Sequence, residues 1–82
     1  MKVIVSRLEQ YPENEPTGWA VGFNVTLENG RSFYTDTVIS FDKAGDDETA
    51  VKKAKTALKS QINKQAAALG KKSSLVGTEV KL

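Results

Sequence analysis

The sequence has 82 residues, of which 39% are hydrophobic and 27% are charged, with a net charge of +2 and neither cysteine nor histidine. This length leaves room for one hydrophobic core, so we expect a single domain over residues 1–82. The composition argues against the disordered and membrane classes, and the lack of cysteine excludes a disulfide framework. We therefore expect a cytoplasmic protein without a membrane partner. The short apolar run within Met1–Arg7 also argues against a signal peptide, so we expect the chain to start at Met1.

The charge is distributed unevenly along the chain. Residues 1–48 contain four basic and nine acidic residues, whereas residues 49–82 contain eight lysines and a single acidic residue, Glu79. A split of this kind between two halves of a chain indicates a polarised surface. We expect one acidic end and one basic end.

Three strand-like segments occupy the first half of the sequence. Lys2–Leu8 alternates weakly and is rich in β-branched residues, and residues 10–18 then form an acidic segment with two prolines that is typical of an exposed loop. Trp19–Leu27 alternates strictly between apolar and small or polar residues, which indicates a strand with one buried face. A third strand is predicted over residues 31–41.

The Asn-Gly pair after the second segment predicts a β-hairpin. A three-residue loop over residues 28–30, with its glycine in the left-handed conformation, pairs Val25 with Phe33 and Trp19 with Ile39 on the buried face. A two-residue turn would instead place an aspartate on that face. With the longer loop, the opposite face carries a mostly polar set of side chains: Asn24, Thr26, Ser32, Tyr34 and Asp36.

The second half of the sequence predicts one long helix from about Asp47 to Leu69. Asp46, Asp47 and Glu48 supply the N-cap and a negatively charged first turn, and Gly70 is a typical C-terminal stop. Apolar or uncharged residues recur at helical spacing along one stripe: Val51, Ala54, Leu58, Ile62, Gln65 and Leu69.

After the helix, residues 76–82 alternate again and suggest a last strand. These elements predict an α+β fold in β-β-β-α-β order. Its mainly antiparallel sheet would have three to four strands, with one long helix packed on one face. That face is expected to carry the alternating apolar side chains: Trp19, Val21, Phe23, Val25 and Leu27.

Nothing in the sequence indicates an enzyme. Without histidine or cysteine the commonest general base, thiol nucleophile and zinc ligands are missing, and no nucleophile, base and orienting group can be assembled. Tyr34 and Asp36 on the outer sheet face are the nearest approach to an acid pair. Four acids lie within residues 42–48, but their spacing differs from that of an EF-hand loop and fits a helix start better. We expect neither a cofactor nor a metal.

Nucleic acid is one candidate partner. Lys52, Lys55 and Lys59 fall within an arc of about 60° beside the apolar stripe of the helix, and phosphate contacts need little more than such a cluster. Base readout is not expected, because no aromatic residue follows Phe41. The alternative interpretation is that these lysines only keep the protein in solution.

A protein partner, including a second copy of the chain, is the other candidate. A helix of this length is longer than the strands, so its last turns could extend past the sheet and expose Ile62 and Leu69. Tyr34 and Asp36 offer a docking surface on the outer face of the sheet. The acidic loop with Tyr11, Pro12 and Pro16 is another candidate contact, and an exposed sheet edge could accept an added strand.

Two resemblances bear on these candidates. The order of three strands and a helix, with Val51-Lys52-Lys53-Ala54-Lys55 entering the helix, resembles the second half of a double-stranded RNA-binding domain over about half the chain. The chain departs from that family because it lacks the first helix and carries acids at residues 46–48 where the family presents lysines, so its RNA contacts are not transferred. The whole layout is similar to several small phage-encoded proteins, including anti-CRISPR inhibitors, which implies a non-enzymatic protein that binds a host macromolecule.

Taken together, these patterns favour a small non-enzymatic binding or adaptor protein that acts through protein–protein interaction. Tyr34, Asp36, Ile62 and Leu69 are the candidate protein-binding residues. Sequence-independent nucleic-acid binding through Lys52, Lys55 and Lys59 is the alternative.

Overall fold

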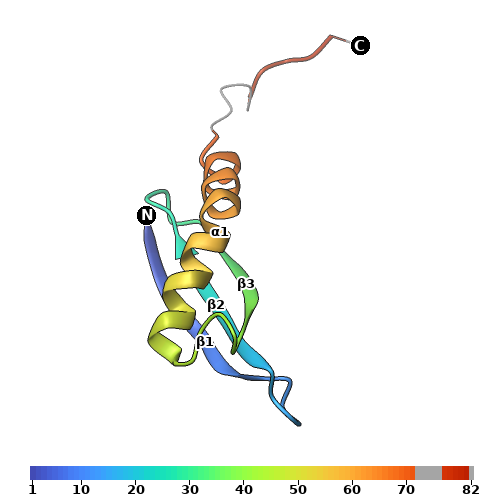
Figure 1. The fold of residues 1–82 in the computed structure, drawn as a ribbon. Helices are drawn as coiled ribbons and strands as arrows, with labels where there is room; N and C mark the ends of the chain where they lie inside the picture. The colour runs from blue at the N-terminus through green and yellow to red at the C-terminus, as the bar shows by residue number, and fades with distance from the viewer. Residues whose placement is uncertain (72–76, 82) are drawn as a thin grey trace.

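The computed structural model of the protein describes residues 1–71 and 77–81. Its elements are β1 (Lys2–Tyr11), β2 (Gly18–Thr26), β3 (Ser32–Ser40) and α1 (Asp47–Leu69) (Figure 1). Within the described residues the strands form one antiparallel sheet in the order β1-β2-β3. The predicted α+β class and the β-β-β-α order are confirmed.

The expected last strand is not found. Residues 77–81 carry no strand, and Val76 and Leu82 lie outside the described residues. Alternation alone did not determine a strand here, because a strand also needs a neighbour whose backbone groups can pair with its own.

The hairpin between β2 and β3 has the predicted register. Val25 pairs with Phe33 and Trp19 pairs with Ile39. The amide of Leu27 donates to the carbonyl of Arg31 at 2.8 Å. Gly30 has a φ of 87°, a left-handed conformation that costs glycine little because it has no Cβ. The loop chemistry therefore determined which side chains of β2 and β3 share a face.

β1 is longer than its sequence pattern suggested. It ends at Tyr11 rather than at Leu8, because Gln10 and Tyr11 pair with the first two residues of β2. The exposed loop is correspondingly shorter than the expected residues 10–18. The pairing of β1 with β2 shifts by one residue between Val5 and Arg7, which marks a β-bulge.

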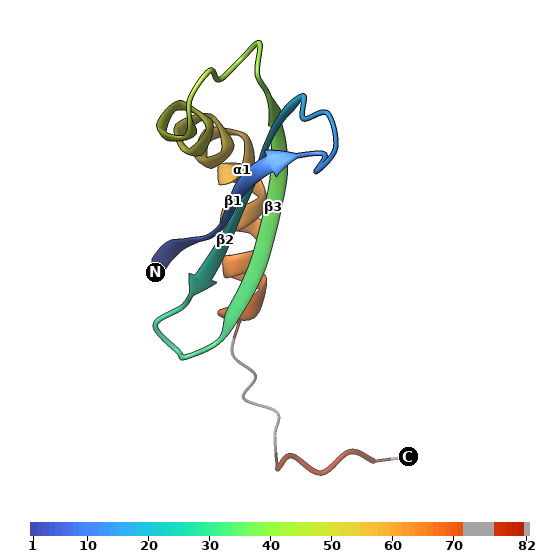
Figure 2. The same ribbon diagram turned by 90° about the horizontal axis from the view of Figure 1, so that it is seen from below.

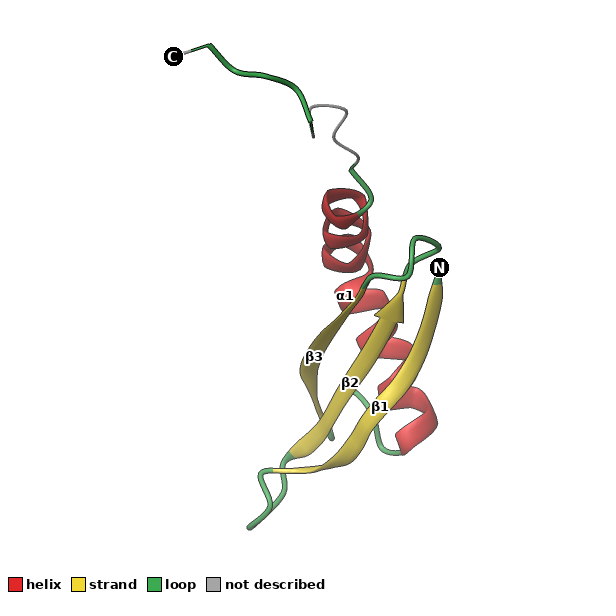
Figure 3. Cartoon of the chain, turned by 180° about the vertical axis from the view of Figure 1, so that it is seen from behind, coloured by secondary structure: helices red, strands yellow, loops and turns green. Residues whose placement is uncertain are grey.

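α1 begins and ends where the caps predicted. The Asp46 side chain accepts a hydrogen bond from the amide of Thr49 at 2.7 Å, and the Gly70 amide donates to the carbonyl of Ala66 at 2.9 Å. The predicted stripe is only partly correct. Of the stripe residues, Ala54, Leu58 and Ile62 are buried, whereas Gln65 is exposed and Leu69 is half-buried. Ala50, which is not part of the predicted stripe, is also buried. The last turns of α1 extend past the ends of the strands, so they leave the core (Figures 1 and 3).

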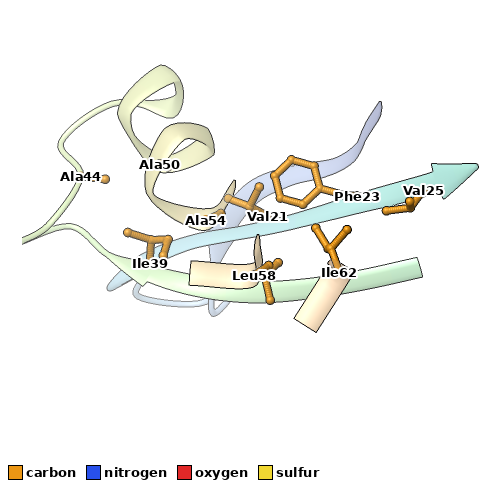
Figure 4. Close-up of a cluster of buried hydrophobic side chains, with 9 residues drawn as sticks. All are labelled: Val21, Phe23, Val25, Ile39, Ala44, Ala50, Ala54, Leu58 and Ile62. Atoms are coloured by element: carbon orange, nitrogen blue, oxygen red, sulfur yellow. The ribbon is translucent and has the colours of Figure 1, made fainter. Parts of the chain in front are cut away.

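The core lies between one face of the sheet and α1 (Figure 4). Val21, Phe23 and Val25 of β2 belong to the same buried cluster as Leu58 and Ile62 of α1. Trp19 lies at one end of this core, where its ring packs edge to face with the Phe41 ring, with the ring centroids 5.8 Å apart. Its Nε1 donates to the carbonyl of Ala44 at 3.1 Å.

The sheet is covered unevenly. α1 crosses one face, and no described element covers the other face (Figures 2 and 3). No residue of β1 is buried, and all of them are exposed except the half-buried Arg7. β1 is therefore a bare edge strand, and the outer face of the sheet is open along all three strands.

Candidate functional site

The outer face of the sheet, on the side away from α1, carries a polar cluster of four side chains: Arg7, Glu9, Tyr34 and Asp36. The Tyr34 hydroxyl donates to Asp36 at 3.2 Å. Arg7 contacts Glu9 at 2.7 Å and Asp36 at 3.6 Å, so it links β1 to β3 across β2. The hydrogen bond and the negative charge of Glu9 raise the pKa of Arg7 above its ordinary value. We call these four residues the outer-face cluster.

Gly22 lies beneath this cluster in the middle of β2. It pairs with Arg7 on one side and with Asp36 on the other. A Cβ at this position would overlap the hydroxyl end of the Tyr34 ring, so the ring can lie close to Gly22 only because this residue has no side chain. The glycine thereby allows the Tyr34 hydroxyl to reach Asp36.

Exposed apolar residues surround the outer-face cluster. Register places Ile4 beside Asn24, Val38 beside Ala20 and Tyr11 beside Gly18, all on the outer face. Their exposed fractions are 49% for Ile4, 50% for Val38 and 46% for Tyr11, and Tyr34 itself is 47% exposed. The outer face therefore combines a charged and aromatic centre with an apolar surround.

A second surface lies on the other side of the sheet, between α1 and the start of β1. It is a groove of about 470 Å³, which we call the α1–β1 groove. Its lining residues come from both elements: Met1, Val3, Lys52, Lys55, Thr56, Lys59, Ile62 and Asn63. The structure thus brings the three predicted nucleic-acid-binding lysines together on the α1 side of the groove, with the apolar Met1 and Val3 on its β1 side. Lys52 also lies 3.8 Å from Glu48.

Ile62 and Leu69 do not form the apolar surface expected at the helix end. Ile62 is only 5% exposed because it packs in the core, and only its edge reaches the α1–β1 groove. Leu69 is half-buried, and its carbonyl accepts a hydrogen bond from the Asn29 side chain at 3.2 Å. The β2–β3 hairpin therefore contacts the last turn of α1. The predicted extension of the helix past the sheet is found, but it does not expose Ile62.

Sequence reasoning named Tyr34 and Asp36 but missed Arg7, Gly22 and the groove residues Met1 and Val3. The glycine in the middle of an otherwise regular strand was an available signal, because such a glycine often marks a close approach by another group. Arg7 could not be placed in advance, since the bulge after Val5 decides which face its side chain takes.

The acids expected to start the helix do so. Asp46 caps α1, and Asp47 and Glu48 lie in its first turn. Across residues 1–71 and 77–81, no three acidic side chains gather closely enough to hold a metal ion. In the same residues, no helix has the length and apolar character needed to cross a bilayer.

A comparison of the chain with protein-family models, with curated proteins and with solved structures finds no match.

Proposed function

We propose that this protein is a non-catalytic binding protein that docks a protein partner on the outer face of its sheet. The observation that carries the proposal is the outer-face cluster itself. Arg7, Tyr34 and Asp36 meet over Gly22 on a face that no described element covers. The lack of cysteine supports placing this activity in a reducing compartment such as the cytoplasm, and the layout supports a phage-encoded protein that binds a host macromolecule.

The composition of this face fits a protein partner. Tyrosine and arginine are enriched among the residues that dominate binding energy at protein interfaces, because they offer large contact areas together with polar groups. Here Tyr34 is already held by the Gly22 backbone beneath it and by its bond to Asp36, so binding would restrict it little further. The surrounding apolar side chains of Ile4 and Val38 would exclude water from the contact.

The test is site-specific photocrosslinking in an extract of the source cells. A benzophenone amino acid replaces Tyr34 in one variant and the exposed Lys53 of α1 in a matched control. We expect a discrete crosslinked protein at position 34 that is absent at position 53. In a further variant the benzophenone amino acid replaces Val38. Adding Arg7→Ala to this variant should lower the yield of crosslinked protein about tenfold, because Ala removes the arginine that links β1 to β3. Equal crosslinking at positions 34 and 53 would overturn the proposal.

A second candidate function is favoured by the α1–β1 groove. Lys52, Lys55 and Lys59 lie along one wall, where they could contact successive phosphates of a nucleic acid without reading its sequence. Met1 and Val3, on the β1 side of the groove, are apolar and give no base specificity.

Titration with duplex and single-stranded oligonucleotides at several salt concentrations tests this candidate. Three phosphate contacts predict a slope of about −2 to −3 in log affinity against log salt. Reversing the charge of Lys55 and Lys59 should abolish binding, whereas the same change at Lys53 and Lys64, outside the groove, should weaken it far less. The absence of binding at low salt would eliminate the candidate.

A further inference from the structure

The two edges of the sheet differ in how well α1 covers them. On the side of α1, β1 leaves Val3 at 42%, Val5 at 41% and Leu8 at 38% exposure. On the same side of β3, Thr35 is 5% exposed and Ile39 is 8% exposed. The edge at β1 therefore combines unpaired backbone groups with a row of exposed apolar side chains, a combination that favours the addition of another strand.

The bulge in β1 limits how two copies of this strand could pair. Val3 and Val5 pair with core residues of β2 and so point toward α1, as does Leu8 beyond the bulge, whereas Ile4 and Arg7 point to the outer face. The bulge shifts the alternation by one residue. Pairs of β1 residues that lie on opposite sides of the bulge therefore match face with face only when the two-fold axis passes between two residues.

Three positions of this axis near the middle of β1 differ in the residues that they place opposite Lys2. With the axis between Val5 and Ser6, Lys2 of each copy lies opposite Glu9 of the other, and Val3 lies opposite Leu8. With the axis between Ile4 and Val5, Lys2 of each copy lies opposite Arg7 of the other, and these two positive charges repel. With the axis between Ser6 and Arg7, Lys2 lies opposite Tyr11 and gains no charged partner.

The ends of the molecule favour the same antiparallel arrangement. The β1–β2 loop, the connection from β3 to α1 and the start of α1 lie at one end (Figure 1), with these acidic residues: Glu13, Glu15, Asp42, Asp46, Asp47 and Glu48. The N-terminus and the second half of α1, with Lys59 and Lys64, lie toward the other end, as does Lys71 just after the helix. Antiparallel pairing of β1 places the acidic end of each copy beside the basic end of the other, which lowers the electrostatic energy of the pair.

We propose that the protein self-associates through β1, which pairs antiparallel with β1 of a second copy about a two-fold axis between Val5 and Ser6. The product is a six-stranded sheet with both helices on the same face. Val3, Val5 and Leu8 of the two copies form one apolar row between the helices. The interface is isologous, so it closes as a dimer and does not propagate. It leaves Tyr34 and Asp36 on the outer face of each copy.

Charge exchange at the two facing positions tests the pairing. Lys2→Glu and Glu9→Lys each place like charges opposite one another twice, and each should weaken self-association about tenfold in light scattering. An equimolar mixture of the two variants restores both opposite-charge pairs, so heterodimers should form with the wild-type affinity. Wild-type association should weaken as salt is raised from 20 mM to 500 mM, which spans Debye lengths of about 20 Å to 4 Å. Lys53→Glu, on the exposed side of α1, is the matched control.

Cysteine variants test the register. The chain has no cysteine, so any disulfide formed by a single-cysteine variant must join two copies. Oxidation of a mixture of Val3→Cys and Leu8→Cys should give a heterodimer in high yield. A mixture of Val5→Cys and Leu8→Cys would crosslink well only if the axis lay between Ser6 and Arg7. We expect this mixture to give at least tenfold less disulfide-linked heterodimer. Circular dichroism on each variant verifies that it folds.

Two results would overturn the proposal. One is a monomer mass for the wild-type protein at 1 mM in low salt, which would mean that the bulge and Lys2 protect this edge from pairing. The other is a wild-type dimer in which the Val3→Cys and Leu8→Cys mixture crosslinks no better than the Val5→Cys and Leu8→Cys mixture. Neither result affects photocrosslinking at position 34. The proposal that a protein partner docks on the outer face is therefore tested separately from the proposal of self-association.

Discussion

At the residue scale, Asp46 shows how one side chain determines where an element begins. Its carboxylate accepts the amide of Thr49, and this hydrogen bond lowers the pKa of Asp46 below its ordinary value. A carboxyl group whose pKa is lower in the folded state stabilises the fold above its unfolded pKa. That stabilisation is lost as pH falls through the lowered, folded-state pKa.

We therefore predict that Asp46→Ala lowers the midpoint of thermal unfolding at pH 7 by on the order of 5 °C. Asp46→Asn keeps an acceptor oxygen and should lose less. The difference between wild type and Asp46→Ala should shrink as pH falls below about 4, where the unfolded carboxyl is already protonated. Equal midpoints for wild type and Asp46→Ala at pH 7 would contradict this role for the cap.

Gly22 is a residue whose role could not be predicted from the sequence. Its place in the alternating pattern was visible in the sequence, but the reason for a glycine there was not. The reason is the Tyr34 ring, which comes from a residue twelve positions later and lies over the Gly22 backbone. The need for space became apparent only when β2 and β3 were paired in their observed register.

At the scale of elements, α1 has two parts with different roles. Its first four turns bury their apolar residues against β2 and β3, whereas its last turns extend past the strands and contact the hairpin through Asn29. Helical periodicity continues to Leu69, so it could not indicate where burial ends. The lengths of the neighbouring strands decide that point.

This division of α1 predicts that two substitutions in the helix lower the free energy of unfolding by different amounts. Ile62→Ala should lower the free energy of unfolding by about 3 kcal/mol, because it leaves a cavity in the core. Leu69→Ala should lower it by less than about 1 kcal/mol, because the half-buried side chain loses little contact. Urea unfolding followed by Trp19 fluorescence measures both values. Similar costs at the two positions would mean that the last turn belongs to the core.

At the scale of the whole molecule, the sheet of β1, β2 and β3 takes no strand from residues 77–81. The expected strand over residues 76–82 has no counterpart in residues 77–81, all of which are exposed. A chain that ends at residue 76 should therefore unfold within about 2 °C of the full-length protein in calorimetry. A fall of 5 °C or more would show that these residues support the fold.

The polarity of the molecule also arises at this scale. The sequence placed acids early and lysines late, but it did not show that the early loop and the start of α1 lie at the same end. The antiparallel hairpins and the return of the chain through α1 bring those acids together and direct the later lysines toward the opposite end.

Local features follow from the sequence alone: the alternation of β2, the loop register that pairs Val25 with Phe33, and the bounds of α1 between Asp46 and Gly70. Each depends on residues within a few positions of one another, through backbone periodicity, turn geometry or a cap. Two other features appear only in the folded chain: Arg7 meets Asp36, and Lys55 and Lys59 line the same groove as Met1 and Val3. The lateral position of a helix on a sheet, and the face a side chain takes beyond a bulge, depend on packing between distant segments, which local patterns do not encode.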